Sequence, residues 1–187
     1  SSMVKRPPGP LTCFPSPMAL ETNSYPDRAM FRLLLIAGSL LPTLSFASPV
    51  PVILILGDSL SAGYGIPLER GWVRLLQDRL AAAGYSHRVV NASVSGDTTA
   101  GGLTRLPPLI ERHHPAVLVI ELGANDGLRG FGFDQIRDSL VRLVRLGRDA
   151  GAQVLLVGTR LPPNYGAGYA KRFQALFAEV AEAEGAG

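Results

Sequence analysis

Short apolar runs alternate along this chain with longer segments in which apolar residues recur at helical spacing. Each run has the length of a buried strand, and the four lie at residues 52–56, 89–92, 116–122 and 153–157. The periodic segments predict helices over residues 72–80, 97–110, 133–144 and 168–184. This alternation predicts the α/β class, with a flavodoxin-like doubly wound parallel sheet, right-handed crossovers and helices on both faces in three layers.

Glycine and proline residues mark the limits of the predicted helices. Gly84 and Gly151 each follow one of them, as expected for residues that end a helix. The segment Asp97-Thr98-Thr99 offers side chains that cap a helix start. The pair Pro107-Pro108 is expected to kink or interrupt the second helix, because proline lacks an N–H group. No linker or internal repeat divides residues 48–187, which predicts one domain there.

The N-terminal part of the chain has a different character. Residues 30–47 are typical of a signal peptide, with Arg32 before an apolar stretch and the small-x-small sequence Ser45-Phe46-Ala47 at the end. We therefore expect a bacterial protein that is periplasmic or secreted. An anchor helix or a buried first helix is the alternative. The Pro-rich, polar residues 1–29 predict a disordered upstream extension, and Cys13 within it leaves the exported protein without a disulfide.

The charge balance argues against nucleic acid as a partner. The chain is 47% hydrophobic and 18% charged, which favours a folded protein over a disordered one. Its net charge is +3, but the part from Ser48 onward holds 14 basic and 13 acidic residues. A nearly neutral body without a basic stripe is not the electrostatic footprint of a nucleic-acid-binding protein. The acidic residues also lack the histidine or cysteine neighbours of a metal site, so we expect neither metal nor cofactor.

Three loops carry the candidate chemistry, and each follows a predicted strand. They are Gly57-Asp58-Ser59 after the first strand, Ser95-Gly96-Asp97 after the second and Gly123-Ala124-Asn125 after the third. Because the carboxyl ends of parallel strands share one edge of the sheet, we expect the loops to converge. Ser59 is the candidate nucleophile. The main-chain N–H groups of Ser59 and Gly96 and the carboxamide of Asn125 are candidate donors to an oxyanion.

Each of these loops also has a structural interpretation when it is taken alone. The first fits a strand-to-helix turn with a capping aspartate, and the second fits a helix cap. The third fits an ordinary turn, in which Asn and Asp are common. All three occur in order, and each directly follows a strand. This coincidence favours an acyl-transfer site over three independent turns.

These blocks resemble those of the GDSL, or SGNH, hydrolases. The resemblance runs from about Val52 to the end of the chain, and it is carried by Gly57–Leu60, Asn91–Thr98, Glu121–Gly130 and Arg160–Gly166. It is strongest to the periplasmic arylesterase, acyl-CoA thioesterase and lysophospholipase subgroup. The resemblance implies an acyl-enzyme at Ser59, with Gly96 and Asn125 in the oxyanion hole.

The fourth block of that family, Asp-x-x-His, does not occur in the sequence. The histidines present are His87, His113 and His114, which precede the second and third predicted strands at the edge opposite the candidate nucleophile. The resemblance implies a further strand, a catalytic loop and a last helix beyond Gly187. We therefore expect residues 48–187 to be a C-terminally truncated SGNH-hydrolase-type domain that by itself is inactive or has very weak activity, since serine needs a base.

The sequence is less specific about the substrate. Leu128, Phe131, Pro163 and Tyr165 follow the third and fourth predicted strands and are candidates to line an acyl groove, although packing against the domain explains them equally well. The expected partner is a small-molecule acyl ester or thioester, bound by a monomer with at most transient contact with membrane lipid. Two alternatives stay open: a non-catalytic flavodoxin-like module that binds phosphate or another ligand, and a degenerate hydrolase.

Overall fold

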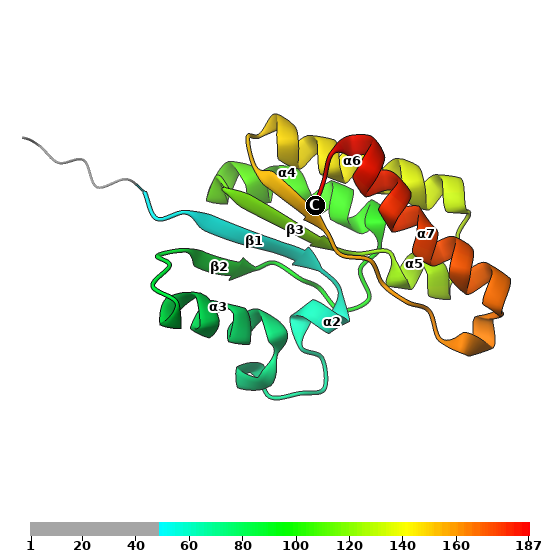
Figure 1. The fold of residues 1–187 in the computed structure, drawn as a ribbon, viewed down its shortest axis with the longest axis horizontal. Helices are drawn as coiled ribbons and strands as arrows, with labels where there is room; N and C mark the ends of the chain where they lie inside the picture. Colours follow the sequence, from blue (N-terminus) through cyan, green and yellow to red (C-terminus); the bar gives the residue numbers. More distant parts are fainter. Residues whose placement is uncertain (1–48) are drawn as a thin grey trace, which may run out of the picture. The chain divides into compact units, whose positions relative to one another are not determined.

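The computed structural model describes residues 49–187, and the predicted extension and leader at residues 1–47 lie outside the described residues. Its centre is a parallel sheet with the strand order β2-β1-β3-β4 (Figure 1). The strands are β1 Val52–Gly57, β2 Arg88–Asn91, β3 Val117–Glu121 and β4 Gln153–Leu156. The predicted doubly wound sheet is confirmed, with each strand within two residues of its expected limits.

Helices cover both faces of the sheet, as predicted. The helical elements are α2 Ser59–Ala62, η1 Leu68–Arg70, α3 Trp72–Ala82, α4 Thr99–His113, α5 Ala124–Leu128, α6 Phe133–Asp149, η2 Pro163–Tyr165 and α7 Ala167–Glu184. Helix α3 packs on one face, and α4, α6 and α7 pack on the other (Figure 1). The short helices α2 and α5 follow β1 and β3 directly and lie at the carboxyl edge of the sheet, where the candidate site was expected.

The two faces are built from alternating residues of the same strands. Leu54 and Leu118 point to the side of α4, α6 and α7, whereas Ile55 and Val119 point to the side of α3. All four side chains are buried, which explains why these strands appear in the sequence as continuous apolar runs. The larger of the two cores lies under α6 and α7, where Phe173 is fully buried.

Helix α4 runs without a break through Pro107 and Pro108, so the expected interruption is wrong. Pro107 and Pro108 are both exposed, so neither ring has to fit into the core. The helix is held to the sheet by the fully buried Leu106. It also approaches the sheet closely at Gly102, where a Cβ atom would lie 2.4 Å from Leu122 Cδ1.

The β4 edge of the sheet carries one further main-chain pairing. The N–H of Gly187 donates to the carbonyl oxygen of Val154, and the N–H of Leu156 donates to that of Gly187. On the α3 side of the same strand, Leu155 is 43% exposed.

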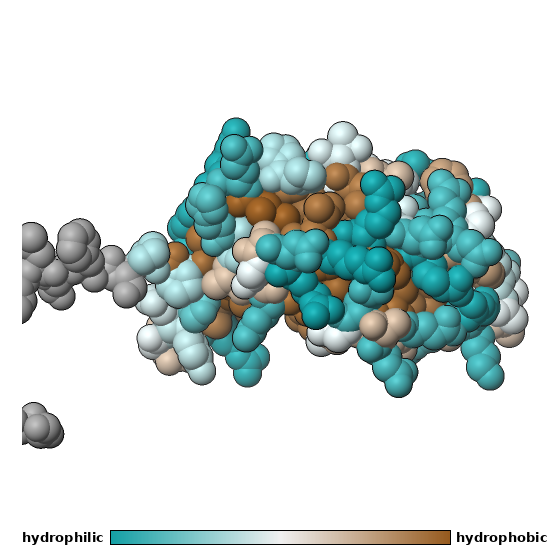
Figure 2. Space-filling model, turned by 90° about the horizontal axis from the view of Figure 1, so that it is seen from above, coloured by the Kyte–Doolittle hydropathy of each residue, from teal (hydrophilic) through white to brown (hydrophobic). Residues whose placement is uncertain are grey.

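Figure 2, viewed from the side on which α6 lies in Figure 1, shows hydrophilic side chains with apolar surface between them. Within residues 49–187, no helix has the length and apolar character that a membrane crossing requires.

Candidate active site

The candidate nucleophile lies in a tight turn between β1 and α2. The Asp58 side chain caps α2, since its Oδ1 accepts a hydrogen bond of 3.0 Å from the N–H of Leu60. Ser59 is the first residue of the helix and is half-buried. Helix α2 ends after one turn at Gly63, which adopts the left-handed conformation that glycine favours. The sequence thus fixes Ser59 at the end of a buried strand, facing the carboxyl edge.

Asn125 connects this turn to the second loop. Its Nδ2 donates to Asp58 Oδ2 over 3.1 Å and to the carbonyl oxygen of Asp97 over 2.9 Å. Asp58 precedes the candidate nucleophile, and Asp97 follows the candidate donor Gly96. One carboxamide therefore joins the three loops that the sequence predicts to converge, and the convergence itself is confirmed.

Two arginines hold the loop between β2 and α4. The Arg105 Nη1 donates to the carbonyl oxygen of Ala92 over 2.6 Å, and the same guanidinium forms an ion pair with Asp97. Directly after α5, the Nη2 of Arg129 donates to the carbonyl oxygen of Gly96 over 3.0 Å. Gly96 has a φ of +82°, a conformation that other residues adopt only with strain. The loop conformation that presents the Gly96 N–H is thus fixed from both ends.

A buried carboxylate ties α5 to the start of α4. Asp126 is 1% exposed, and its two oxygens accept hydrogen bonds from the N–H of Thr99 over 3.0 Å and from the Thr99 hydroxyl over 2.6 Å. This pair, next to Asn125 in sequence, explains why the third loop keeps its place against the second. It also satisfies a carboxylate that would otherwise be costly to bury.

The arrangement leaves donors available for an anion. Within the described residues, the N–H groups of Ser59 and Gly96 make no hydrogen bond. Burial raises the pKa of Asp58, with a further rise from the charges of Asp97 and Asp126, whereas the N–H of Leu60 and the Asn125 amide lower it. The free N–H groups of Ser59 and Gly96 lie in loops that the Asn125 carboxamide joins, and donors of this kind can support the negative oxygen of an acyl-transfer intermediate.

The histidines lie at the other edge of the sheet, as expected. His87 directly precedes β2, and His113 and His114 end α4 before β3 begins. These positions are at the amino ends of parallel strands, while Ser59 follows a carboxyl end. Among residues 49–187, therefore, no imidazole reaches the candidate nucleophile.

The candidate groove residues separate into two environments. Leu128 ends α5 and Tyr165 lies in η2; both are exposed, and the Tyr165 hydroxyl donates to the Leu128 carbonyl oxygen over 3.3 Å. Pro163 begins η2 and is exposed. Phe131 is half-buried and packs against the main core. A role of these four residues in substrate binding stays a prediction. Of the four, Phe131 is the one that packs against the main core.

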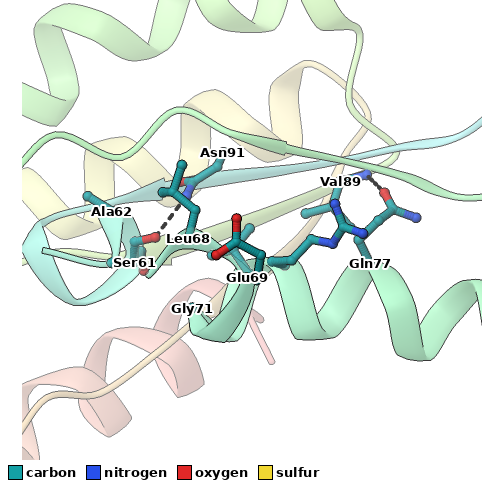
Figure 3. Close-up of a pocket in the computed structure, with 11 residues that line it drawn as sticks. Ser61, Ala62, Leu68, Glu69, Gly71, Gln77, Val89 and Asn91 are labelled. Carbon is teal, nitrogen blue, oxygen red and sulfur yellow. Dashed lines mark hydrogen bonds between the residues drawn. The ribbon is translucent and has the colours of Figure 1, made fainter. Parts of the chain in front are cut away.

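A cleft of about 430 Å³ lies beside the nucleophile turn, on the α3 side (Figure 3). It is bounded by α2, η1, α3 and β2, and its lining includes Ser61 and Asn91 but not Ser59. Two contacts near it were not predicted: Asn91 Nδ2 donates to the Ser61 carbonyl oxygen, and the Ser61 hydroxyl donates to Glu121. A carboxylate at the end of an apolar strand was the available signal for Glu121.

The sheet order and the three joined loops define a flavodoxin-like α/β protein with the blocks of a serine acyl hydrolase. The profile of the GDSL-like Lipase/Acylhydrolase family matches residues 55–187, which is more than half of the chain. The chain therefore belongs to the GDSL-like lipase/acylhydrolase family.

Similarity to individual proteins agrees with this membership. The chain is 49% identical over 154 residues to Esterase TesA of Pseudomonas aeruginosa, covering 82% of the chain and 77% of that protein. It is 43% identical over 136 residues to Thioesterase 1/protease 1/lysophospholipase L1 of Escherichia coli K12, covering 73% of the chain and 64% of that protein. A crystal structure of TesA superposes with a TM-score of 0.71 at 51% identity, covering 72% of the chain and 75% of its own.

Proposed function

We propose that the full-length protein is a serine hydrolase of carboxylic esters or thioesters that works through an acyl-enzyme at Ser59. The observation that carries the proposal is the double hydrogen bond of Asn125 to Asp58 and to the Asp97 carbonyl. It supports a common site for the hydroxyl, the Gly96 N–H and the carboxamide. Family membership and the printed names of the relatives, an esterase and a thioesterase, support the same reaction class.

In the proposed reaction, Ser59 Oγ adds to the carbonyl carbon of the substrate and loses its proton to a base. The carbonyl oxygen becomes an oxyanion held by the N–H groups of Ser59 and Gly96. Asn125 turns one N–H from the Asp58 carboxylate to this oxygen. Collapse of the intermediate breaks the bond to the alcohol or thiol, which leaves with a proton, and water then releases the acid. Each donor of this kind contributes about 100- to 1,000-fold to the rate.

The base is the part of this mechanism that residues 49–187 do not supply. We assign it to a segment of the Asp-x-x-His type, which the sequence of 187 residues does not contain. Without an imidazole, a serine hydrolase keeps only the effects of binding and of the oxyanion hole, a loss of about 10⁶-fold. A degenerate hydrolase is the second candidate, and the distance of all three histidines from Ser59 is the observation that favours it.

A phosphate-binding role for the first loop has less physical support. The buried carboxyl groups of Asp58 and Glu121 lie at this turn, and among residues 49–187 neither forms an ion pair with a basic side chain that could also balance a bound phosphate. The substrates we propose are aryl esters, short or medium acyl esters, acyl thioesters and lysophospholipids. We further propose a monomer that is exported through the leader at residues 30–47 and meets membrane lipid only transiently.

The experiment is a comparison of wild type with Ser59→Ala in the full-length protein, using p-nitrophenyl esters, acyl-CoA thioesters and a fluorophosphonate probe. We expect hydrolysis and covalent labelling in the wild type and neither in the variant. Labelling at a different residue, or hydrolysis that survives in Ser59→Ala, would contradict the proposal. A folded wild type that resists the probe would instead support the degenerate hydrolase.

A further inference from the structure

Among residues 49–187, no basic side chain forms an ion pair with the buried carboxyl group of Glu121. It lies at the end of β3, is 4% exposed, and its Oε1 has no hydrogen-bond partner among residues 49–187. The other oxygen, Oε2, accepts a hydrogen bond of 2.7 Å from the hydroxyl of Ser61, which is itself 2% exposed. Burying a carboxyl group in this way is costly, so its position against the turn that carries Ser59 requires an explanation.

The contacts of Glu121 lead to the turn that carries Ser59. Ser61 belongs to the single turn of α2, which begins with the candidate nucleophile. Burial raises the pKa of Glu121, and the hydrogen bond from the Ser61 hydroxyl opposes that rise. The group that stabilises this carboxylate therefore belongs to the turn that begins with Ser59.

A second contact holds the same turn from the neighbouring strand. The Asn91 Nδ2 donates to the Ser61 carbonyl oxygen over 2.8 Å, as the dashed line in Figure 3 shows. Ser61 is thus anchored by its main chain to the end of β2 and by its side chain to the end of β3. A helix of four residues has few hydrogen bonds of its own, so these anchors decide how it sits on the sheet.

The space for this arrangement depends on Gly57. Gly57 pairs with Glu121 in the register of β1 and β3. A Cβ atom at Gly57 would lie 2.6 Å from Ser61 Oγ, 2.7 Å from Ser61 Cβ and 2.9 Å from Ser93 Oγ. A side chain at this position would therefore push Ser61 away, and glycine leaves room for the Ser61 hydroxyl to reach the carboxylate.

From these contacts, and resting on the proposed function, we propose that Glu121 is a positioning residue for the nucleophile. It holds Ser61 and the main chain of the turn, and so sets the direction of the Ser59 hydroxyl and N–H toward the substrate carbonyl. Glu121 does not touch the reacting atoms. A displacement of about 1 Å in a nucleophile can lower the rate by about 100-fold, which is the size of effect that the anchor controls.

The test measures kcat and KM for a p-nitrophenyl ester, and the rate of fluorophosphonate labelling, in the full-length protein. The variants are Ser61→Ala, Glu121→Ala, their double mutant, and Gly57→Ala, which moves Ser61 without altering the carboxyl group. Each is expected to lower kcat by about 100-fold with KM within about threefold of wild type. The double mutant is expected to have the same kcat as Ser61→Ala and Glu121→Ala, because each single replacement already removes the one hydrogen bond between these two side chains.

Two further variants separate positioning from stability. Glu121→Gln keeps an oxygen for the Ser61 hydroxyl and is expected to recover kcat to within about fivefold of wild type, even if Glu121→Ala unfolds. Glu184→Gln is the matched control: it removes a carboxyl group from the ion pair with Arg145 at the end of α7, and kcat should not change. Fluorescence of Trp72, the single tryptophan, reports the folded fraction during urea titration.

The outcomes distinguish this inference from the function on which it rests. If Ser59 is labelled in the wild type but all the variants keep kcat within threefold, the inference is wrong and the hydrolase proposal stands. Multiplying effects in the double mutant, or losses that follow the unfolded fraction alone, also overturn it. If wild-type Ser59 is not labelled, the proposed function fails first.

Discussion

The replacement Asn125→Asp tests the junction of the three loops by its effect on stability. The two side chains have nearly the same shape, but the amide that donates to Asp58 Oδ2 and to the Asp97 carbonyl becomes an oxygen. Both hydrogen bonds are lost, and a second carboxyl group is placed 3.1 Å from the first. Asn125→Ala is the control, since it removes the same hydrogen bonds without adding a charge.

The expected magnitude follows from that separation. Two unit charges 3.1 Å apart repel by about 5 kcal/mol at an effective dielectric of about 20 and by about 1 kcal/mol in bulk water. Asn125 is half-buried, so the cost at neutral pH should fall between these limits. Loss of the two hydrogen bonds adds about 1 kcal/mol each in both variants.

The size of the pH dependence separates the two variants. In folded Asn125→Asp the two carboxyl groups raise each other's pKa above the unfolded value of about 3.9, in addition to the rise that burial gives Asp58. A raised folded pKa means that stability is retained at low pH and lost as the pH rises through that pKa. The deficit of Asn125→Asp relative to wild type should therefore grow between pH 4 and pH 7.5.

Urea unfolding at several pH values, followed by Trp72 fluorescence, measures this difference. The deficit of Asn125→Ala should grow less with pH, because that replacement removes the hydrogen bond that lowers the pKa of Asp58 but introduces no second carboxyl group. If the deficit of Asn125→Asp grows no more than that of the alanine variant, or if the two deficits match at pH 7.5, Asn125 does not face Asp58 as described and the three loops do not converge.

Three further predictions concern other parts of the domain. Glu121→Gln should gain stability relative to wild type as the pH rises from 4 to 8. Burial raises the pKa of Glu121, so the wild type loses folding free energy when this group ionises, and glutamine does not ionise. Parallel curves of stability against pH for the two proteins would contradict this. Gly102→Ala should destabilise the protein by about 1–3 kcal/mol, because the new methyl group would collide with Leu122. Gly168→Ala in α7, where a Cβ atom meets nothing within 4 Å, should be neutral or stabilising by up to about 1 kcal/mol. Equal midpoints of the two variants in thermal melts would refute the packing argument. Arg129→Ala should slow fluorophosphonate labelling of Ser59 by freeing the Gly96 loop, with thermal stability little changed; unchanged labelling would show that the loop is held without it.

The strands and their order could be predicted because the sheet is buried on both sides. Residues such as Leu54 and Ile55 point to opposite faces, yet both are apolar, so the run is visible without knowledge of the partners. The continuous helix through Pro107 and Pro108 could not be predicted for the opposite reason. The effect of proline on a helix is local, whereas α4 also depends on the burial of Leu106 and on the exposure of both prolines, which only the fold determines.

The site was predictable as three loops but not as a network. Asn125 and Asp58 are 67 positions apart, and no local pattern indicates that their side chains meet. The role of Glu121 was missed for a related reason. In the sequence it is the polar end of an apolar strand, and only the fold shows that its carboxyl group reaches Ser61, 60 positions away.

The most direct measurement of the central claim is a crystal structure of the full-length protein after reaction with a phosphonate probe. A phosphonyl group bonded to Ser59 Oγ imitates the tetrahedral intermediate, and its free oxygen marks the position of the oxyanion. We predict that this oxygen lies about 2.7–3.1 Å from the main-chain nitrogens of Ser59 and Gly96 and from Asn125 Nδ2. An adduct on another residue, or an oxygen that contacts solvent in place of these three donors, would contradict the account.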